Sequence, residues 1–227
     1  MDVLYEDNHI IIVNKQPSEI VQGDKTGDVP LSETVKAYLK AKYDKPGNVF
    51  LGVTHRLDRP TSGIVLFAKT SKALSRLNAM FSKGEISKTY HAIVPRMADT
   101  EDTTLTHWLT RNERQNKSYA HDKETKDSKK AILTFRTISH GDRYTLVEVQ
   151  LHTGRHHQIR CQLAAIGHVI KGDLKYGAPR SNPDGSISLH ARQIVFEHPV
   201  SHEQVNVTAP YPAGGIWESL FNGKQLH

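Results

Sequence analysis

Short apolar runs recur along the whole chain and predict more strand than helix. The predicted strands are residues 3–5, 10–14, 50–53, 64–69, 89–94, 131–138, 144–151, 191–196 and 205–208. Within residues 144–151, Val147, Val149 and Leu151 alternate onto one face, whereas Leu146 falls on the other. This alternation predicts a strand that presents one continuous apolar face.

Three further segments place apolar residues at helical spacing. One helix opens near residue 32 and ends by Pro46-Gly47, a second runs from about residue 71 to Gly84, and a third covers residues 156–166 before Gly167. Strands dominate and do not alternate with helices. The chain is therefore expected to form an α+β fold, with a mixed, largely antiparallel sheet and flanking helices and loops. We expect a single domain over residues 1–227.

Composition is that of a soluble globular protein, with 37% hydrophobic and 24% charged residues among 227. The longest unbroken apolar run, residues 64–68, is far shorter than the ~20 residues that a membrane helix needs. The start of the chain is acidic, unlike a signal peptide, and Cys161 is the only cysteine. We therefore expect a cytoplasmic protein without a disulfide framework.

Charge changes the picture of possible partners. Lys and Arg number 30 against 24 Asp and Glu, which gives a net charge of +6 and favours a polyanion such as nucleic acid. Residues 111–130 are the most loop-like stretch, with seven Lys or Arg, four acidic residues and hardly any apolar side chain. Two interpretations stay open: a loop that contacts RNA through Lys126, Lys129 and Lys130, and an ordinary solvated hairpin.

The first segment with candidate chemistry is residues 55–63, between two predicted strands. Arg56 and Arg59 flank Asp58 and would lower the pKa of its carboxyl group if they come near it. An ionised carboxylate on a tight loop can act as a nucleophile or a base. The alternative is a surface turn, because Asp, Pro, Ser and Gly are the residues that turns use.

The second segment, residues 153–160, passes from a strand end through a glycine turn into a helix. Such a helix start suits anions, and Arg160 lies one helical turn inside, where it could project next to an active-site carboxylate. His156 and His157 suggest a metal, but adjacent residues are expected to diverge on a helix, and no further ligand set accompanies them.

The third segment is the predicted strand around Tyr90. Alternation places Lys88, Tyr90 and Ala92 on one face. A tyrosine there is commonly a core or cross-strand aromatic residue. Its functional alternative is a platform that stacks on a nucleobase.

These segments together resemble the RluA-type pseudouridine synthases, a family of RNA-modifying enzymes. Residues 55–63 read H-R-L-D-R-P-T-S-G and residues 153–160 read T-G-R-H-H-Q-I-R, both close to motifs of that family. Further matches are residues 3–7, 13–15, 167–173, 176–177 and 189–191. The matches run in order over most of the chain, so Asp58 is interpreted as a functional residue and not merely as part of a turn.

The resemblance implies a pseudouridine synthase catalytic fold and a role for each matched residue. Asp58 would be the catalytic aspartate that converts uridine to its carbon-glycoside isomer, and Tyr90 would stack on the target base. Arg160 would pair with the catalytic carboxylate, and Arg56 would help to fill the gap that the flipped nucleotide leaves. Candidate RNA contacts besides Arg56 are Arg59, Arg155, His156, Lys126, Lys129 and Lys130.

The reaction is a rearrangement without net redox change, so no cofactor or metal is expected. The expected partner is ribosomal or transfer RNA. We expect a monomer that has no obligate protein partner and no separate N-terminal RNA-binding module. Two other classes are kept: a catalytically silent RNA-binding protein that retains the fold, and a histidine-dependent hydrolase, prompted by 14 His. RNA cleavage that EDTA abolishes would indicate the hydrolase.

Overall fold

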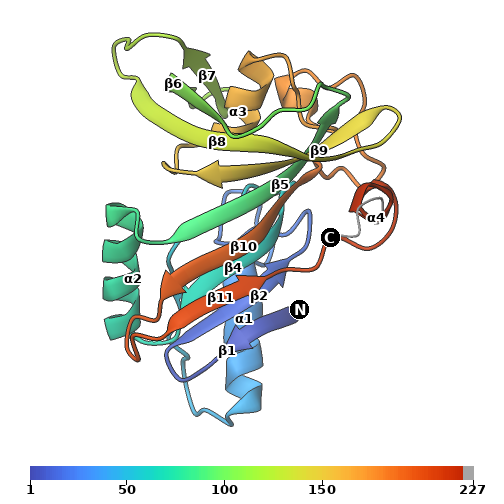
Figure 1. The fold of residues 1–227 in the computed structure, drawn as a ribbon. Coiled ribbons are helices and arrows are strands. Elements are labelled where there is room, and N and C mark those ends of the chain that lie inside the picture. The colour runs from blue at the N-terminus through green and yellow to red at the C-terminus, as the bar shows by residue number, and fades with distance from the viewer. Residues whose placement is uncertain (222–227) are drawn as a thin grey trace. The chain divides into compact units, whose positions relative to one another are not determined.

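The computed structural model describes residues 1–221, and the chain divides into two compact units (Figure 1). Unit 1 comprises Met1–Ile86 and Ala191–Pro210, and unit 2 comprises Ser87–His190 and the segment from Tyr211 onward. Each unit is built on antiparallel strands with few helices. The predicted α+β class with a largely antiparallel sheet is confirmed.

Unit 1 has a core of fully buried central strands. Its strands follow the order β1-β2-β4-β10, with β11 paired to β10 and β3 paired to β4. Their bounds are Asp2–Glu6 for β1, Ile10–Lys15 for β2, Gly52–Val53 for β3, Ser62–Ala68 for β4, Leu189–Glu197 for β10 and Gln204–Thr208 for β11. Every residue of β2 and β4 is buried, so these continuous apolar runs are covered on both faces.

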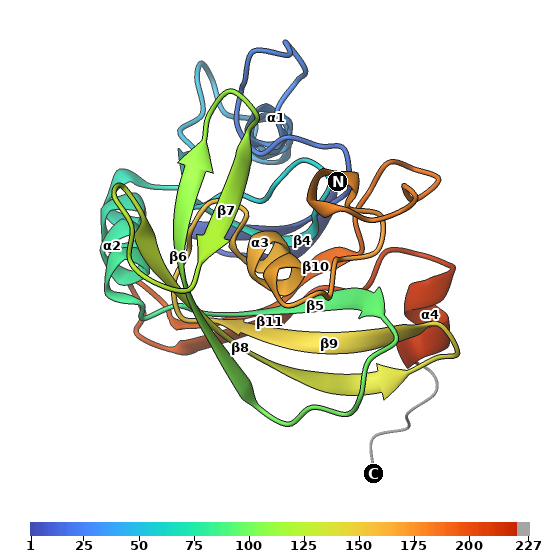
Figure 2. The same cartoon turned by 90° about the horizontal axis from the view of Figure 1, so that it is seen from above.

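Two helices complete unit 1. Helix α1 (Leu31–Lys42) is seen from the side near β1 and β2 in Figure 1 and end-on in Figure 2. Helix α2 (Ser71–Lys83) packs on β3 and β4. Thr70 caps the start of α2 by accepting a hydrogen bond from the Ala73 N–H at 3.1 Å. Gly84 ends it with φ +73°, as the sequence predicted. With 13 residues, α2 is the longest helix in the described part of the chain, so none there could cross a bilayer.

Unit 2 holds five antiparallel strands in the order β5-β9-β8-β6-β7, in which β6 with β7 and β8 with β9 form hairpins. The bounds are Ser87–Pro95 for β5, Thr103–Asn112 for β6, Lys117–His121 for β7, Lys129–His140 for β8 and Tyr144–Leu151 for β9. The unit also holds α3 (Gln158–Ala165), the short 3-10 helix η1 (Leu174–Tyr176) and α4 (Ile216–Phe221). Leu146 faces away from Val147 and Val149, as predicted, and packs with Ile93, Trp217 and Leu220.

The structure corrects the predicted elements in four places. Helix α1 ends at Lys42, ahead of Pro46, and the strand predicted over residues 50–53 shortens to Gly52–Val53. Helix α3 begins at Gln158 because His157 adopts a left-handed conformation with φ +52°. Strands β6 and β7, which form a hairpin, were not predicted as strands.

Strands β6 and β7 escaped prediction because their side chains are mainly polar. Leu109 and Ser118 are buried, whereas most of their neighbours on β6 and β7 are partly or fully exposed. Backbone pairing of Trp108 with His121 through Asn112 with Lys117 holds the two strands together. A strand at the end of a sheet can be stabilised by its backbone hydrogen bonds without a continuous apolar pattern.

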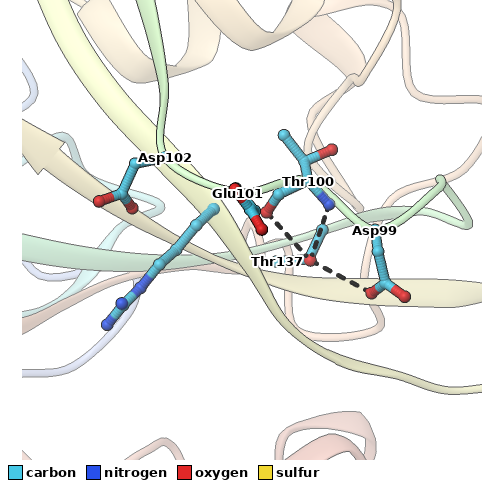
Figure 3. A pocket seen from close by; sticks show the side chains of 6 residues that line it. Asp99, Thr100, Glu101, Asp102 and Thr137 are labelled. Atoms are coloured by element: carbon cyan, nitrogen blue, oxygen red, sulfur yellow. Dashed lines mark hydrogen bonds between the residues drawn. The ribbon is translucent and has the colours of Figure 1, made fainter.

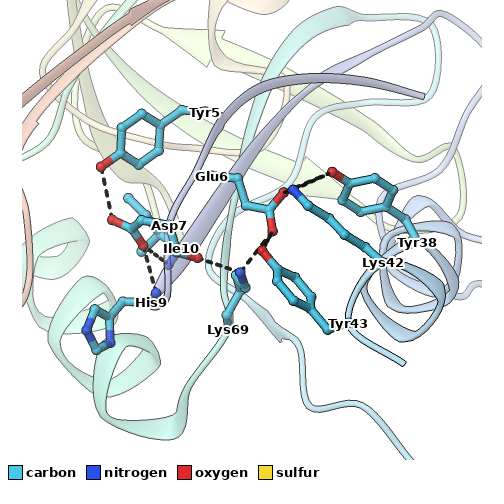
Figure 4. A network of polar contacts seen from close by, with 9 residues as sticks. All are labelled: Tyr5, Glu6, Asp7, His9, Ile10, Tyr38, Lys42, Tyr43 and Lys69. Carbon is cyan, nitrogen blue, oxygen red and sulfur yellow. Dashed lines mark hydrogen bonds and ion pairs between the residues drawn. The ribbon is translucent and has the colours of Figure 1, made fainter. Parts of the chain in front are cut away.

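A charged cluster in unit 1 joins β1 to the end of α1 (Figure 4). The Glu6 carboxylate accepts hydrogen bonds from Lys42 at 2.7 Å, Lys69 at 3.0 Å and the Tyr38 hydroxyl at 2.9 Å, and also from Tyr43. Burial alone would raise the pKa of Glu6, but these donors stabilise the carboxylate and lower the pKa to about 2. The cluster therefore depends on an ionised Glu6.

We predict that Glu6→Gln destabilises the protein at pH 7 by about 1–2 kcal/mol, because the donors around Glu6 lose their charged acceptor. The loss is no larger because Lys42 is partly exposed and solvent screens its attraction to Glu6. A lowered folded-state pKa means that the contribution is complete above the ordinary Glu value of ~4.3 and is lost as pH falls towards 2. Urea midpoints at several pH values measure this difference. Glu33→Gln, at an exposed ion pair on α1, is the matched control. A pH-independent difference would contradict the interpretation.

Candidate active site

Asp58 lies half-buried on the loop between β3 and β4, and this loop is attached to β4 at one residue. The Leu66 N–H donates to Nε2 of His55 at 2.9 Å, and the Thr54 hydroxyl donates to the Leu66 carbonyl at 2.5 Å. At Asp58 itself the chain turns, with the Thr61 N–H donating to the Asp58 carbonyl at 3.0 Å. The carboxylate is thus carried on a backbone with a defined conformation.

Gly63 explains the last position of the 55–63 motif. It has φ +111°, and a Cβ added there would lie 2.3 Å from the carbonyl oxygen of Ala191. No side chain fits at that distance, so β4 and β10 can approach each other only over a glycine. The motif glycine therefore serves backbone packing directly behind the Asp58 loop.

Lys15, the last residue of β2, is fully buried beneath the same loop. Its ammonium group donates to three carbonyl oxygens, of Gln16 at 3.0 Å, Arg59 at 3.1 Å and Thr61 at 2.6 Å. Burial lowers the pKa of Lys15 to about 8, while the negative charges of Glu19 and Asp58 oppose that shift. In the sequence, Lys15 stands out only as part of the matched segment 13–15. A lysine at the end of a strand that begins with four apolar residues was the available signal.

The two arginines that flank Asp58 lie in different surroundings. Arg56 is exposed. Arg59 reaches back to the preceding loop, where its guanidinium donates to Asp28 at 2.8 Å and lies 3.6 Å from Asp24. Arg59 therefore ties the Asp58 loop to residues 24–28 through exposed ion pairs.

In unit 2, Tyr90 lies on β5 opposite Val149 and is 7% exposed. Lys88, two residues earlier, is half-buried, and burial lowers the pKa of its ammonium group. Its Nζ atom lies 3.6 Å from the position that a Cβ of Gly154 would occupy. The strand that carries Tyr90 thus runs beside the glycine turn of the second motif.

The second motif is held to β8 by the side chain of Gln158. Its Oε1 atom accepts from the Thr153 hydroxyl at 2.8 Å and the Arg155 N–H at 2.9 Å, and its Nε2 atom donates to the Ile132 carbonyl at 3.0 Å. The Ile132 N–H in turn donates to Thr153 at 2.9 Å. These hydrogen bonds pair polar groups of the turn and of the segment just before α3, which explains why Thr and Gln occupy these motif positions.

Arg160 projects from the first turn of α3 and is 5% exposed. Its Nε and Nη2 atoms donate to the two carboxylate oxygens of Asp173 at 2.7 and 2.9 Å, and Asp173 is completely buried. The arginine is therefore held in a bidentate pair. The sequence had indicated residues 167–173 only as a family match, without a role for Asp173.

The structure brings several predicted RNA contacts next to the hairpin of β6 and β7. Arg155 donates through Nε to the Lys130 carbonyl at 2.9 Å, and His156 lies 3.0 Å from Oδ1 of Asn116 in the hairpin turn. Lys126, Lys129 and Lys130 are all exposed. Two of these, Lys129 and Lys130, begin β8, while Lys126 lies on the β7–β8 connection.

The prediction that His156 and His157 diverge is wrong. Their rings stack with centroids 3.8 Å apart, because the left-handed backbone of His157 places both residues before the helix begins. Among residues 1–221, no group of three or more His, Cys, Asp or Glu is arranged to hold a metal ion.

A pocket of about 690 Å³ in unit 2 has a different character (Figure 3). Asp99, Glu101 and Asp102 line it together with Thr100, Thr137 and Arg136, and Thr137 binds both Asp99 and the backbone of Thr100. Three carboxylates against one guanidinium repel a phosphate backbone. This pocket therefore does not suit RNA.

Comparison with known proteins identifies the family. Residues 9–165 match the RNA pseudouridylate synthase family. The chain belongs to this family. It is 32% identical to an uncharacterized RNA pseudouridine synthase of Bacillus subtilis, YlyB, over 93% of this chain and 69% of that protein. It is also 32% identical to ribosomal large subunit pseudouridine synthase C of Vibrio cholerae, over 93% and 66%.

A solved structure supports the fold. Human RNA pseudouridylate synthase domain containing 4 superposes with a TM-score of 0.76 at 20% identity, over 93% of this chain and 88% of that one. The resemblance to RluA-type enzymes is confirmed by these relatives. The protein is an RNA pseudouridine synthase, an enzyme that isomerises uridine to pseudouridine.

We predict that Lys15→Met lowers the free energy of unfolding by about 2–3 kcal/mol, because buried carbonyls of the Asp58 loop lose their donor. Urea denaturation measures the change. Lys40→Met, on an exposed position of α1, is the control and should shift the midpoint little. Equal shifts for the two variants would show that the three hydrogen bonds of Lys15 do not stabilise the loop.

Proposed function

We propose that this pseudouridine synthase acts on specific uridines of structured RNA, ribosomal or transfer RNA, with Asp58 as the catalytic carboxylate. The observation that carries this assignment is the attachment of the Asp58 loop through Lys15, His55 and Thr54. A reacting group needs a fixed position relative to its substrate. The loop also lies within the part of the chain that matches the family.

The chemistry requires that the N1–C1′ glycosidic bond of uridine breaks and a C5–C1′ bond forms. A proton leaves C5 and N1 gains one, so atoms and electrons balance without a cofactor. The base must first leave the helical stack, as in other enzymes that act on nucleobases. Asp58 takes part in this reaction either by attacking the sugar or the base or by removing a proton from one of them. Both roles need an ionised carboxylate.

The remaining site residues bind and position the flipped uridine. Tyr90 stacks on its base, and its largely buried ring on a central part of β5 supports a fixed platform. Arg160 pairs with the catalytic carboxylate, and its rigid guanidinium suits that role. Arg56, exposed beside Asp58, fills the gap left in the RNA.

The basic surface of unit 2 binds the RNA backbone. Arg155, His156, Lys126, Lys129 and Lys130 surround the hairpin of β6 and β7, and Arg59 adds a contact beside Asp58. A net charge of +6 supports attraction to RNA in general. The ribosomal name of the Vibrio relative supports ribosomal RNA, and hence a cytoplasmic site of action. The monomeric state remains a prediction from the sequence.

We predict that Asp58→Asn abolishes turnover while the dissociation constant for RNA changes by less than about twofold, because the substitution removes the reacting oxygen and leaves the basic surface. Both proteins are incubated with total RNA from cells lacking the enzyme, and pseudouridines are then mapped by position. Pseudouridine formed only by the wild type identifies the target. Full turnover by Asp58→Asn would overturn the assignment.

We predict that replacing Lys126, Lys129 and Lys130 by Gln weakens RNA binding and lowers the slope of log K against log salt by about 2. Filter binding at several salt concentrations measures the slope. Replacing the exposed Lys25, Lys40 and Lys72 of unit 1 changes the net charge equally and is the control. If both triple variants lose the same slope, the hairpin is an ordinary solvated element.

A further inference from the structure

The Arg160 guanidinium is held by more than its ion pair with Asp173. Its Nη1 atom lies 3.1 Å from Nε2 of His157, and its Cζ atom lies 5.2 Å from the ring centroid of Tyr176. An arginine N–H can only donate, so Nε2 of His157 is the acceptor and carries no proton. The neutral ring of His157 then bears its proton on Nδ1.

That proton continues the chain of hydrogen bonds. Nδ1 of His157 lies 2.9 Å from the Tyr176 hydroxyl and donates to it, while the Ser118 N–H donates to the same oxygen at 2.9 Å. The buried Ser118 is part of β7. A continuous path therefore runs from Asp173 through Arg160, His157 and Tyr176 to the backbone of the hairpin.

A second set of contacts ties the same strand to the start of α3. The Ser118 hydroxyl donates to the His156 carbonyl and also contacts Nδ1 of His156, each at 2.8 Å. The side chain of Lys117 lies over the Tyr176 ring at 5.2 Å, the same distance as Arg160. A displacement of β7 would thus move the Tyr176 hydroxyl, which contacts His157, and the Tyr176 ring, which contacts Arg160.

The turn that carries Asp173 leaves little freedom for an alternative arrangement. Gly172 has φ +88°, and a Cβ there would come within 2.8 Å of Asn182 and of the Ser186 carbonyl. The Asp173 carbonyl accepts from the N–H groups of Tyr176 and Ala178 at 3.1 and 3.0 Å. Asp173 and Tyr176 therefore move as one rigid turn.

We infer that Asp173, His157 and Tyr176 are positioning residues that orient Arg160, and that they make its orientation depend on the hairpin of β6 and β7. This inference rests on the proposed function, in which Arg160 pairs with the catalytic carboxylate and the hairpin surface binds RNA. RNA that seats on the hairpin holds β7 in place and, through Tyr176 and His157, holds the guanidinium ready for the reaction. The enzyme thereby couples recognition to chemistry.

The test compares single-turnover rates with RNA affinity. The substrate is bulk RNA from cells lacking the enzyme, labelled with tritium at C5 of uridine, because pseudouridine formation releases that label. Asp173→Asn should lower the rate at least 30-fold, and Tyr176→Phe, which keeps the ring, five- to tenfold. Both should bind RNA within twofold of the wild type.

Tyr211→Phe is the matched control, because its hydroxyl also contacts a histidine of unit 2, Nδ1 of His91 at 2.6 Å, but lies outside the path to Arg160. Its rate should stay within twofold of the wild type. The double variant Asp173→Asn with Tyr176→Phe should have a single-turnover rate little lower than that of Asp173→Asn alone, since both residues act through one guanidinium. If the fold-losses in rate of the two single variants multiply in the double variant, the inference is overturned, because independent effects on the rate multiply in this way.

Arg160→Lys separates this inference from the proposed function. A full rate for Arg160→Lys would show that the guanidinium has no part in the reaction and would refute the proposed role of Arg160. A slow Arg160→Lys together with full rates for Asp173→Asn and Tyr176→Phe would refute the positioning path alone. Thermal unfolding of each variant identifies any that fails to fold, and Tyr176→Phe, which loses one hydroxyl, then decides the matter.

Discussion

The buried ammonium of Lys15 is the constraint on which the Asp58 loop depends. A charge that leaves water must find compensating partners, and Lys15 has three carbonyl oxygens as acceptors. Two of these oxygens belong to the loop residues Arg59 and Thr61, so hydrogen bonds join the end of β2 to the residues that lead into β4. The register that pairs Lys15 with Gly63 places the ammonium where these carbonyls converge.

Unit 2 solves a similar problem with different chemistry. Lys15 is a compact charge that can serve several backbone acceptors, whereas Arg160 presents a planar fork that matches the carboxylate of Asp173. The two hydrogen bonds fix the plane of the guanidinium. Hydrogen bonds through His157 and Tyr176 then connect Arg160 to β7. Each motif is thus stabilised by one buried basic side chain. For residues 55–63 it is Lys15, from outside the motif, and for residues 153–160 it is Arg160, from within it.

Local signals predicted the elements that local interactions stabilise. Gly84 ends α2 as predicted, and the apolar alternation of residues 144–151 marks β9, since capping and burial on one face act over a few residues. Strands β6 and β7 could not be found this way, because their side chains are mainly polar and backbone pairing with neighbouring strands stabilises them. The start of α3 was misplaced by two residues, since a left-handed His157 has no clear signature in sequence.

The sequence by itself determined the family and the identity of Asp58, Tyr90 and Arg160 as candidates, because the motifs around them are long and occur in order. It also determined the basic character of residues 111–130. Only the tertiary structure decided that Lys15 lies under the loop, that Asp173 holds Arg160, and that Tyr176 meets Ser118. Those contacts join residues up to 58 positions apart, and their geometry arises only when the strands pair and the turns close.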